Sequence, residues 1–243
     1  MIESTFDDIL YGKLKMHQPL HGPRISVDTI LLSWFAKLKN DDNVIELGTA
    51  SGAVALILAK RWPHVPVIRA IDIQEDLIKM AKENAAINGL SDRVVFEVGD
   101  IRKIHALYPT QSFDVVVVNP PYNEISGSRI SPKRNLAISR QGIACTLKDV
   151  IKASFYLLKD KGRLYLILRA KRISELCYFL EKNRMPLKRL KVVYPKPGRE
   201  ASVVLVEARR NTGRGACIEP PVYICDESGN YTPELLSAYK IGE

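Results

Sequence analysis

The sequence predicts an α/β fold with a seven-stranded, mostly parallel sheet, helices on both faces and a C-terminal antiparallel hairpin. Short apolar runs alternate with segments of helical periodicity between residues 25 and 180. Four successive runs end in glycine-rich or polar residues, which is where an open α/β sheet binds its ligands. Two further runs, 187–194 and 201–208, flank a turn with Pro and Gly and predict the hairpin.

Composition limits the class of protein. The chain has 243 residues, 46% of them hydrophobic, which suits one large α/β domain with an appendage or two small domains. Residues 1–10 hold three acidic side chains and do not resemble a signal peptide, and no apolar run reaches the ~18 residues of a membrane span. The four cysteines lack paired Cys-x-x-Cys spacing and His partners. We therefore expect a cytoplasmic protein without a metal site and with reduced thiols.

Charge is divided unevenly along the chain. Residues 1–125 hold 13 Lys and Arg against 16 Asp and Glu, a net of −3, whereas residues 126–243 hold 23 against 11, a net of +12. A basic half predicts a polyanionic partner, nucleic acid before membrane. The alternative is a basic solvated surface with no binding role.

The chain divides into three parts. Residues 1–24 show no sustained period and form a lead-in with room for a short hairpin. Residues 25–210 form the main domain. Its first helix starts near Ser26, where Asp28 and Thr29 fall in the first turn, a position for ligand binding or for ordinary capping. Residues 211–243 form a tail packed on the domain.

A strand at 43–47, a tight turn at 48–52 and a helix at 53–61 form a typical start of a cofactor-binding α/β unit. The Gly-x-Gly-x-x-Gly pattern is not met, because Ala50 and Ala53 replace its second and third glycines counted from Gly48. A dinucleotide site is therefore disfavoured.

The next two strands also end in acidic residues. Asp72 closes the strand 67–71 and lies 20 residues after Gly52. This spacing is close to that of an acidic residue that binds the hydroxyls of a ribose. Ile73 follows and suits packing on a base. The helix 75–88 follows. The strand 94–98 is followed by Asp100, which suits either a ligand contact or a helix cap.

The strand 113–118 ends in Asn119-Pro120-Pro121-Tyr122. The prolines prevent the strand from continuing and leave the carbonyl groups of Asn119 and Pro120 without ladder partners. The side-chain oxygen of Asn119 is a further acceptor. The Asn119 side-chain oxygen and the Pro120 carbonyl, two acceptors beside the Tyr122 ring, suit a planar group that carries an NH₂.

The second half supplies cations. Residues 123–141 predict a flexible basic loop that engages substrate, or alternatively a disordered insertion with no binding role. A helix at 147–158, ended by Lys161-Gly162, precedes a fifth strand at 163–168. The candidate substrate-binding cations lie in the loop, after the fifth strand and at the hairpin tip: Arg129, Lys133, Arg134, Arg169, Lys171, Arg172, Lys196 and Arg199.

Two of these motifs resemble those of class I S-adenosylmethionine-dependent methyltransferases, which have a Rossmann-like sheet. The sequence Asn119-Pro120-Pro121-Tyr122 resembles the catalytic motif of members that act on exocyclic or amide nitrogens. The turn at 48–52 resembles the motif that wraps the amino-acid part of the cofactor, with Ala50 in place of the middle glycine. The resemblance implies cofactor contacts from Asp28, Thr29, Glu46, Gly48, Thr49, Ala50, Gly52, Asp72, Ile73, Asp100, Ile101 and Asn119.

The C-terminal half narrows the resemblance. The segments 169–172, 194–207 and 231–234 resemble those of tRNA adenine-N6 methyltransferases that modify adenine 37, after the anticodon of a valine tRNA. This implies an RNA substrate, with S-adenosylhomocysteine as product. The same motif also fits an enzyme that methylates a glutamine amide in a release factor, and a non-catalytic RNA-binding protein is a third reading. Monomer and homodimer both stay open.

Overall fold

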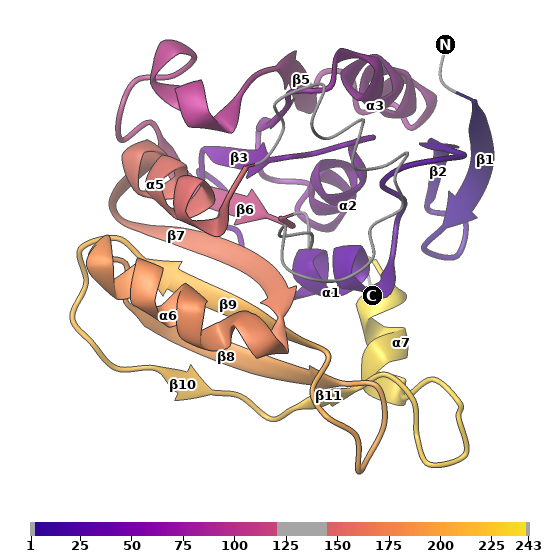
Figure 1. The fold of residues 1–243 in the computed structure, drawn as a ribbon. Helices are drawn as coiled ribbons and strands as arrows, with labels where there is room; N and C mark the ends of the chain where they lie inside the picture. The colour runs from indigo at the N-terminus through magenta and orange to yellow at the C-terminus, as the bar shows by residue number, and fades with distance from the viewer. Residues whose placement is uncertain (1–2, 121–144, 242–243) are drawn as a thin grey trace.

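The computed structural model describes residues 3–120 and 145–241. A central sheet lies between two layers of helices (Figure 1). One face packs against α1 (Val27–Phe35), α2 (Ala53–Arg61) and α3 (Glu75–Ile87). The other face packs against the 3₁₀ helix η1 (Ile101–Ala106), α5 (Leu147–Leu157) and α6 (Ile173–Lys182).

Seven strands form the central part of the sheet, in the order β5-β4-β3-β6-β7-β9-β8. Their bounds are β3 Val44–Leu47, β4 Ile68–Asp72, β5 Val94–Val98, β6 Phe113–Val118, β7 Leu158–Arg169, β8 Leu187–Tyr194 and β9 Val203–Arg209. Neighbours from β5 to β7 pair in parallel, whereas β9 is antiparallel to both β7 and β8. The predicted α/β class and the C-terminal antiparallel hairpin are confirmed.

Two short strands, β10 (Cys217–Ile218) and β11 (Val222–Tyr223), pair with β8 and bring the sheet to nine strands. Two residues are too few to show a strand periodicity, so the sequence did not reveal either strand.

The apolar run of β6 explains why this strand lies at the centre. Val115 and Val117 belong to the core on the α2 face, whereas Val116 and Val118 belong to the core on the α5 face. Successive side chains of a strand point to opposite faces, so a strand covered on both sides needs an unbroken apolar run.

The predicted end of the helix at Lys161-Gly162 is wrong. Helix α5 ends at Leu157, and Lys161, with φ +60°, lies inside β7. There the pairing with β6 jumps from Phe113–Leu158 to Val115–Arg163. A residue in the left-handed region followed by glycine occurs both at helix ends and at irregularities within strands. In this protein the pairing of β7 with β6 favoured the strand.

The N-terminal lead-in folds as an antiparallel hairpin of β1 (Ser4–Ile9) and β2 (Leu14–Pro19). Leu14 and Met16 of β2 are buried in the core on the α2 face. Figure 1 shows the hairpin beside α3, on the far side of the molecule from α6.

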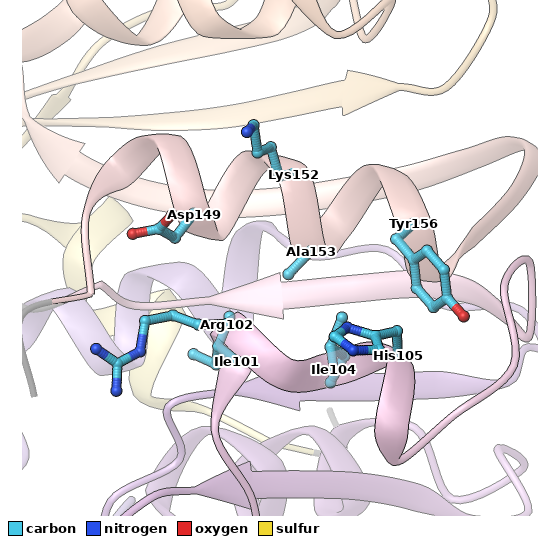
Figure 2. A pocket seen from close by; sticks show the side chains of 8 residues that line it. All are labelled: Ile101, Arg102, Ile104, His105, Asp149, Lys152, Ala153 and Tyr156. Carbon is cyan, nitrogen blue, oxygen red and sulfur yellow. The ribbon is translucent and has the colours of Figure 1, made fainter.

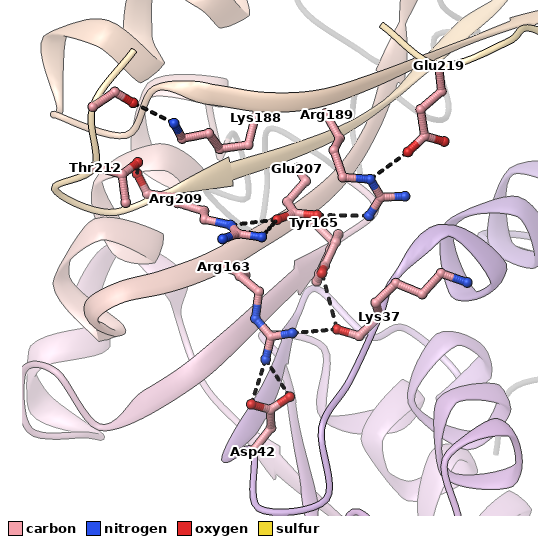
Figure 3. A network of polar contacts seen from close by, with 11 residues as sticks. Lys37, Asp42, Arg163, Tyr165, Lys188, Arg189, Glu207, Arg209, Thr212 and Glu219 are labelled. Atoms are coloured by element: carbon pink, nitrogen blue, oxygen red, sulfur yellow. Dashed lines mark hydrogen bonds and ion pairs between the residues drawn. The ribbon is translucent and has the colours of Figure 1, made fainter. Parts of the chain in front are cut away.

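Half-buried ion pairs attach the tail to the hairpin of β8 and β9. Arg189 of β8 binds Glu207 of β9 at 2.8 Å and Glu219 of the tail at 2.5 Å (Figure 3). Burial acts to raise the pKa of Glu207, but hydrogen bonds from Arg189 and Arg209 outweigh it and lower the pKa. The last helix of the described residues, α7 (Pro233–Tyr239), packs on α1.

Within residues 3–120 and 145–241, no helix is both long and apolar enough to cross a membrane.

Candidate active site

The carboxyl ends of β3 and β6 place Gly48 beside Asn119. Leu47 and Val118 are partners in the parallel pairing of these strands, and Gly48 and Asn119 are the residues that follow them. Both are half-buried, and Pro120 is buried. Adjacent strands are ~4.8 Å apart, so the Asn119 amide lies at the edge of the turn at 48–52.

The turn at 48–52 has an unusual backbone. Gly48, Ala50 and Gly52 have φ values of +77°, +49° and +92°. The amides of Gly48 and Thr49 both donate to the carbonyl of Ile71 in β4, at 2.8 and 3.0 Å. A Cβ atom on Gly48 would meet no heavy atom within 4 Å, so the turn leaves open space next to Asn119. A Cβ on Gly52 would meet Phe96 Cζ at 2.7 Å, so this glycine is required for packing.

Asp72 holds the turn from the neighbouring strand. Its Oδ2 accepts from the amide of Ala50 at 2.9 Å, and its Oδ1 accepts from the amide of Gln74 at 3.0 Å. Oδ1 also accepts from Gln74 Nε2 at 3.3 Å. The two backbone donors fix the carboxylate at the carboxyl end of β4, and Oδ2, with one hydrogen bond, retains acceptor capacity.

Glu46 of β3 binds both the turn at 48–52 and the start of α2. The side chain is 1% exposed, and its Oε2 accepts from Thr49 Oγ1 at 2.6 Å and from the amide of Ala55 at 3.0 Å. Burial raises the pKa of Glu46 to about 7, and the two hydrogen bonds oppose that rise.

Asp100 caps the helix η1 that follows β5. Its carboxylate accepts from the backbone amide of Arg102 at 2.9 Å and pairs with the Arg102 guanidinium at 2.7 Å. The hydrogen bonds from Arg102 lower the pKa of Asp100. The capping arrangement that the sequence allowed is therefore present.

A pocket of about 290 Å³ lies between η1 and α5, next to Ile101. Figure 2 shows Arg102 and Asp149 at one end and His105 and Tyr156 at the other. Its lining comes from η1 and α5 and includes no residue of the turn at 48–52.

The first helix begins where the sequence placed it. Ser26 is the N-cap of α1, and its amide donates to Thr29 Oγ1 at 3.4 Å. Thr29 is 4% exposed and its hydroxyl serves the helix start, whereas Asp28 is half-buried. The helix packs on α2.

Burial divides the candidate cofactor residues into two groups. One group is buried: Thr29, Glu46, Thr49, Gly52 and Asp72. The other is half-buried: Asp28, Gly48, Ala50, Ile73, Asp100, Ile101 and Asn119. The strand ends bring most of the second group to one edge of the sheet.

Basic residues gather at the same edge, beyond Asn119. β7 lies next to β6, and Arg169 ends it three residues beyond Leu166, the partner of Val118. The amide of Ala170 donates to Ser202 at 3.1 Å, and Lys171 pairs with Glu200 at 3.4 Å. These contacts join the segment 169–172 to the hairpin tip with Lys196 and Arg199. Arg172 instead pairs with Glu175 at 2.9 Å.

Other sequence candidates fall outside the described residues. They are Pro121, Tyr122, Arg129, Lys133 and Arg134, together with the basic loop 123–141.

One residue at this site was missed by the sequence reasoning. Asn84 of α3 is fully buried, and its Nδ2 donates to the carbonyl of Ser51 in the turn at 3.0 Å. Its signal was a polar residue seven positions after Leu77, on the apolar face of a helix.

Comparison with known proteins agrees with this geometry. A family model described as a methyltransferase domain matches residues 38–178. The chain is 31% identical over 192 residues to a tRNA1(Val) (adenine(37)-N6)-methyltransferase of Porphyromonas gingivalis, covering 76% of this chain and 74% of that protein. It is 28% identical over 213 residues to a protein of the same name from Aeromonas hydrophila, covering 88% of this chain and 87% of that protein.

A solved structure shows the same fold. A predicted O-methyltransferase from Agrobacterium tumefaciens matches with a TM-score of 0.70 at 19% identity, covering 88% of this chain and 98% of that chain. With the family model and the relatives, these matches show that the chain belongs to the methyltransferase-domain proteins and, among them, to the tRNA1(Val) (adenine(37)-N6)-methyltransferase family.

Proposed function

We propose that this protein transfers a methyl group from S-adenosylmethionine to the exocyclic N6 of an adenine in RNA, with position 37 of a valine tRNA as the favoured target. The observation that carries the proposal is the adjacency of Asn119 and Gly48 at the carboxyl edge of the sheet. It brings an amide acceptor next to the open space of a cofactor turn, in a chain of this family.

The residues at the edge fit this cofactor. The open space at the Cβ position of Gly48 is where we place the amino-acid moiety, and Oδ2 of the oriented Asp72 carboxylate retains acceptor capacity for a ribose hydroxyl. Ile73 and Ile101 are half-buried and suit the faces of an adenine ring, and Asp100 suits its amino group. When bound, S-adenosylmethionine supplies an electrophilic methyl group on a sulfonium centre.

Asn119 and Pro120 orient the nucleophile. The adenine amino group is a poor nucleophile because its lone pair is delocalised into the ring. Hydrogen bonds from this NH₂ to the Asn119 Oδ1 and the Pro120 carbonyl favour a tetrahedral nitrogen with its lone pair directed at the cofactor side. Proximity and orientation of the reacting groups together can contribute as much as roughly 7–11 kcal/mol. No strong general base is required, because the nitrogen becomes acidic once it is alkylated.

An anticodon-loop adenine suits this site. A base in a loop is already single-stranded, so turning it into the site costs less than extrusion from a duplex. We propose that Tyr122 stacks on the base, which is worth ~1–3 kcal/mol. Arg169, Lys171 and Arg199 then contact phosphates from the neighbouring edge. Since tRNA is made and used in the cytoplasm, we propose the same compartment for the enzyme.

The test is incubation of the full chain with methyl-labelled cofactor and, separately, bulk tRNA, bulk ribosomal RNA and a release factor. Nucleoside mass spectrometry is expected to find N6-methyladenosine in the tRNA sample, and a valine tRNA carrying guanine at position 37 to stay unlabelled. Label on a glutamine of the release factor, with none in tRNA, would overturn the assignment.

A further inference from the structure

We propose that Asn84 is a positioning residue for the cofactor turn, and that it couples this turn to the N-terminal hairpin. The inference rests on the proposed function, because that function assigns the turn at 48–52 to S-adenosylmethionine. It extends the proposed cofactor site to Asn84 of α3 and to the hairpin of β1 and β2, neither of which belongs to the motifs at the strand ends.

The amide of Asn84 links three segments. Its Nδ2 donates to the carbonyl of Ser51 at 3.0 Å and to the carbonyl of His17 at 2.9 Å. Its Oδ1 accepts from the amide of His17 at 2.7 Å. An amide NH₂ has two donors, and both are used, although the side chain is fully buried. No other residue type of this size offers two donors and an acceptor in one plane.

The turn needs such a restraint. Three of its five residues, Gly48, Ala50 and Gly52, lie at positive φ, and Ala50 is there despite its Cβ. Ser51 is 3% exposed, so water cannot readily replace the donor that Asn84 provides to its carbonyl. Asp72 holds the turn at Ala50 from one side, and Asn84 holds it at Ser51 from the other.

The residue of β2 that follows His17 is hydrogen-bonded to the segment just before α1. Gln18, which follows His17, is 4% exposed. Its Oε1 accepts from the amide of Ile25 at 2.7 Å, and its Nε2 donates to Asp7 Oδ2 at 2.8 Å. Ile25 immediately precedes the N-cap Ser26. The same segment therefore connects the turn to the first turn of α1, where Asp28 lies.

Asn88 offers a matched control one helical turn away. It binds the hairpin in the same manner, since its Oδ1 accepts from the amide of Lys15 at 2.9 Å and its Nδ2 donates to the Lys15 carbonyl at 2.6 Å. Its Nδ2 also donates to the carbonyl of Asn84, at 2.7 Å. These contacts hold β2 on α3 and do not include the turn at 48–52.

The experiment compares the full-length wild type with Asn84→Ala and Asn88→Ala. Calorimetric titration with S-adenosylhomocysteine is expected to show Kd about tenfold higher for Asn84→Ala, which corresponds to ~1.4 kcal/mol, and less than about twofold higher for Asn88→Ala. In the ligand-free chains, amide hydrogen exchange at residues 48–52 is expected to be faster in Asn84→Ala alone. At saturating cofactor, kcat is expected to stay near the wild-type value while KM for the cofactor rises.

The outcomes separate the inference from the proposed function. Equal exchange at 48–52 in the wild type and Asn84→Ala would refute the positioning role, and so would equal losses of affinity in both variants. A wild type that binds no S-adenosylhomocysteine would refute the proposed function, while the exchange comparison would still decide the positioning role. If Asn84→Ala does not melt cooperatively, Asn84→Ser, which keeps one hydrogen-bonding group, replaces it. Its Kd for S-adenosylhomocysteine and its exchange rate at 48–52 are again expected to exceed those of Asn88→Ala, by smaller factors.

Discussion

The carboxylate of Asp72 accepts a hydrogen bond from the backbone amide of Ala50 at 2.9 Å, and this contact joins the ends of two neighbouring strands. The acid is thereby oriented and the turn is held at a residue whose φ is +49°. The contact explains how the turn keeps its shape although alanine stands at a position that favours glycine, and it leads to the first prediction.

Ala50→Gly is expected to stabilise the protein. An L-residue in the left-handed region costs roughly 1–2 kcal/mol, while glycine adds about 0.5–1 kcal/mol of unfolded-state entropy cost. The net expectation is a free energy of unfolding up to about 1 kcal/mol higher, measured by urea denaturation. Ala53→Gly, in the first turn of α2, is the control and is expected to lower the free energy of unfolding. Destabilisation by both variants would contradict this account.

Gly52→Ala is expected mainly to lower stability, whereas Gly48→Ala is expected mainly to lower affinity for the cofactor. A Cβ at Gly52 overlaps Phe96, so that variant is expected to lose about 1–3 kcal/mol from packing, in addition to backbone strain. A Cβ at Gly48 meets only open space, so the stability loss is expected to be confined to strain, about 1–2 kcal/mol. Affinity for S-adenosylhomocysteine is expected to fall in Gly48→Ala in proportion to the space that the methyl group fills. Thermal melting and calorimetric titration measure the two effects, and unchanged affinity in Gly48→Ala would argue against a cofactor above this residue.

Asn119→Ala is expected to slow methyl transfer strongly and to leave cofactor binding nearly unchanged. The amide oxygen acts on the substrate amino group, and removal of one such oriented contact commonly costs about 10²–10³ in kcat. Single-turnover transfer to tRNA and titration with S-adenosylhomocysteine measure the two quantities. Asn43→Ala, an exposed residue at the opposite end of β3, is the control. Full activity in Asn119→Ala would refute the assignment.

Glu46 is expected to make stability fall as pH rises. Burial raises its pKa in the folded chain from 4.5 to about 7. Between these values the unfolded chain has released its proton and the folded chain still holds it, so the free energy of unfolding decreases with rising pH. The shift corresponds to roughly 3 kcal/mol across this window. Below pH 4.5 and above about pH 7 the contribution of this group is flat.

Glu46→Gln is expected to remove that slope. Urea denaturation of wild type and variant at pH 5 and pH 8 measures the difference, with Glu83→Gln, an exposed residue of α3, as control. Parallel pH profiles for wild type and Glu46→Gln would show that Glu46 does not keep its proton in this range.

Binding of tRNA is expected to weaken steeply with salt, because phosphate contacts release counterions. The double variant Lys171→Ala with Arg199→Ala removes two cations from the edge beyond Asn119, and each lost phosphate contact is expected to reduce the slope of log K against log salt by about 1. Filter binding between low and moderate salt measures this slope. Lys82→Ala, exposed on α3, is expected to leave it unchanged. A flat salt response of the wild type would exclude the basic edge as the RNA-binding surface.

The sequence by itself determined the order of the elements and the chemistry at the strand ends. The apolar run 113–118, the turn at 48–52 and Asp72 are local signals, because periodicity and turn residues act within a few positions. Since parallel strands expose their carboxyl ends at one edge, the adjacency of Gly48 and Asn119 followed once β3 and β6 were paired.

Only the tertiary structure decided the contacts that hold the site in place. Asn84 meets Ser51 33 positions away and His17 67 positions away, and no local pattern encodes such a pairing. The same applies to β10 and β11, which are strands because β8 offers a free edge, and to Lys161-Gly162, where pairing with β6 overrode a helix-end signal. The physical reason is that a hydrogen-bonding partner far along the chain exists only after the core has formed around it.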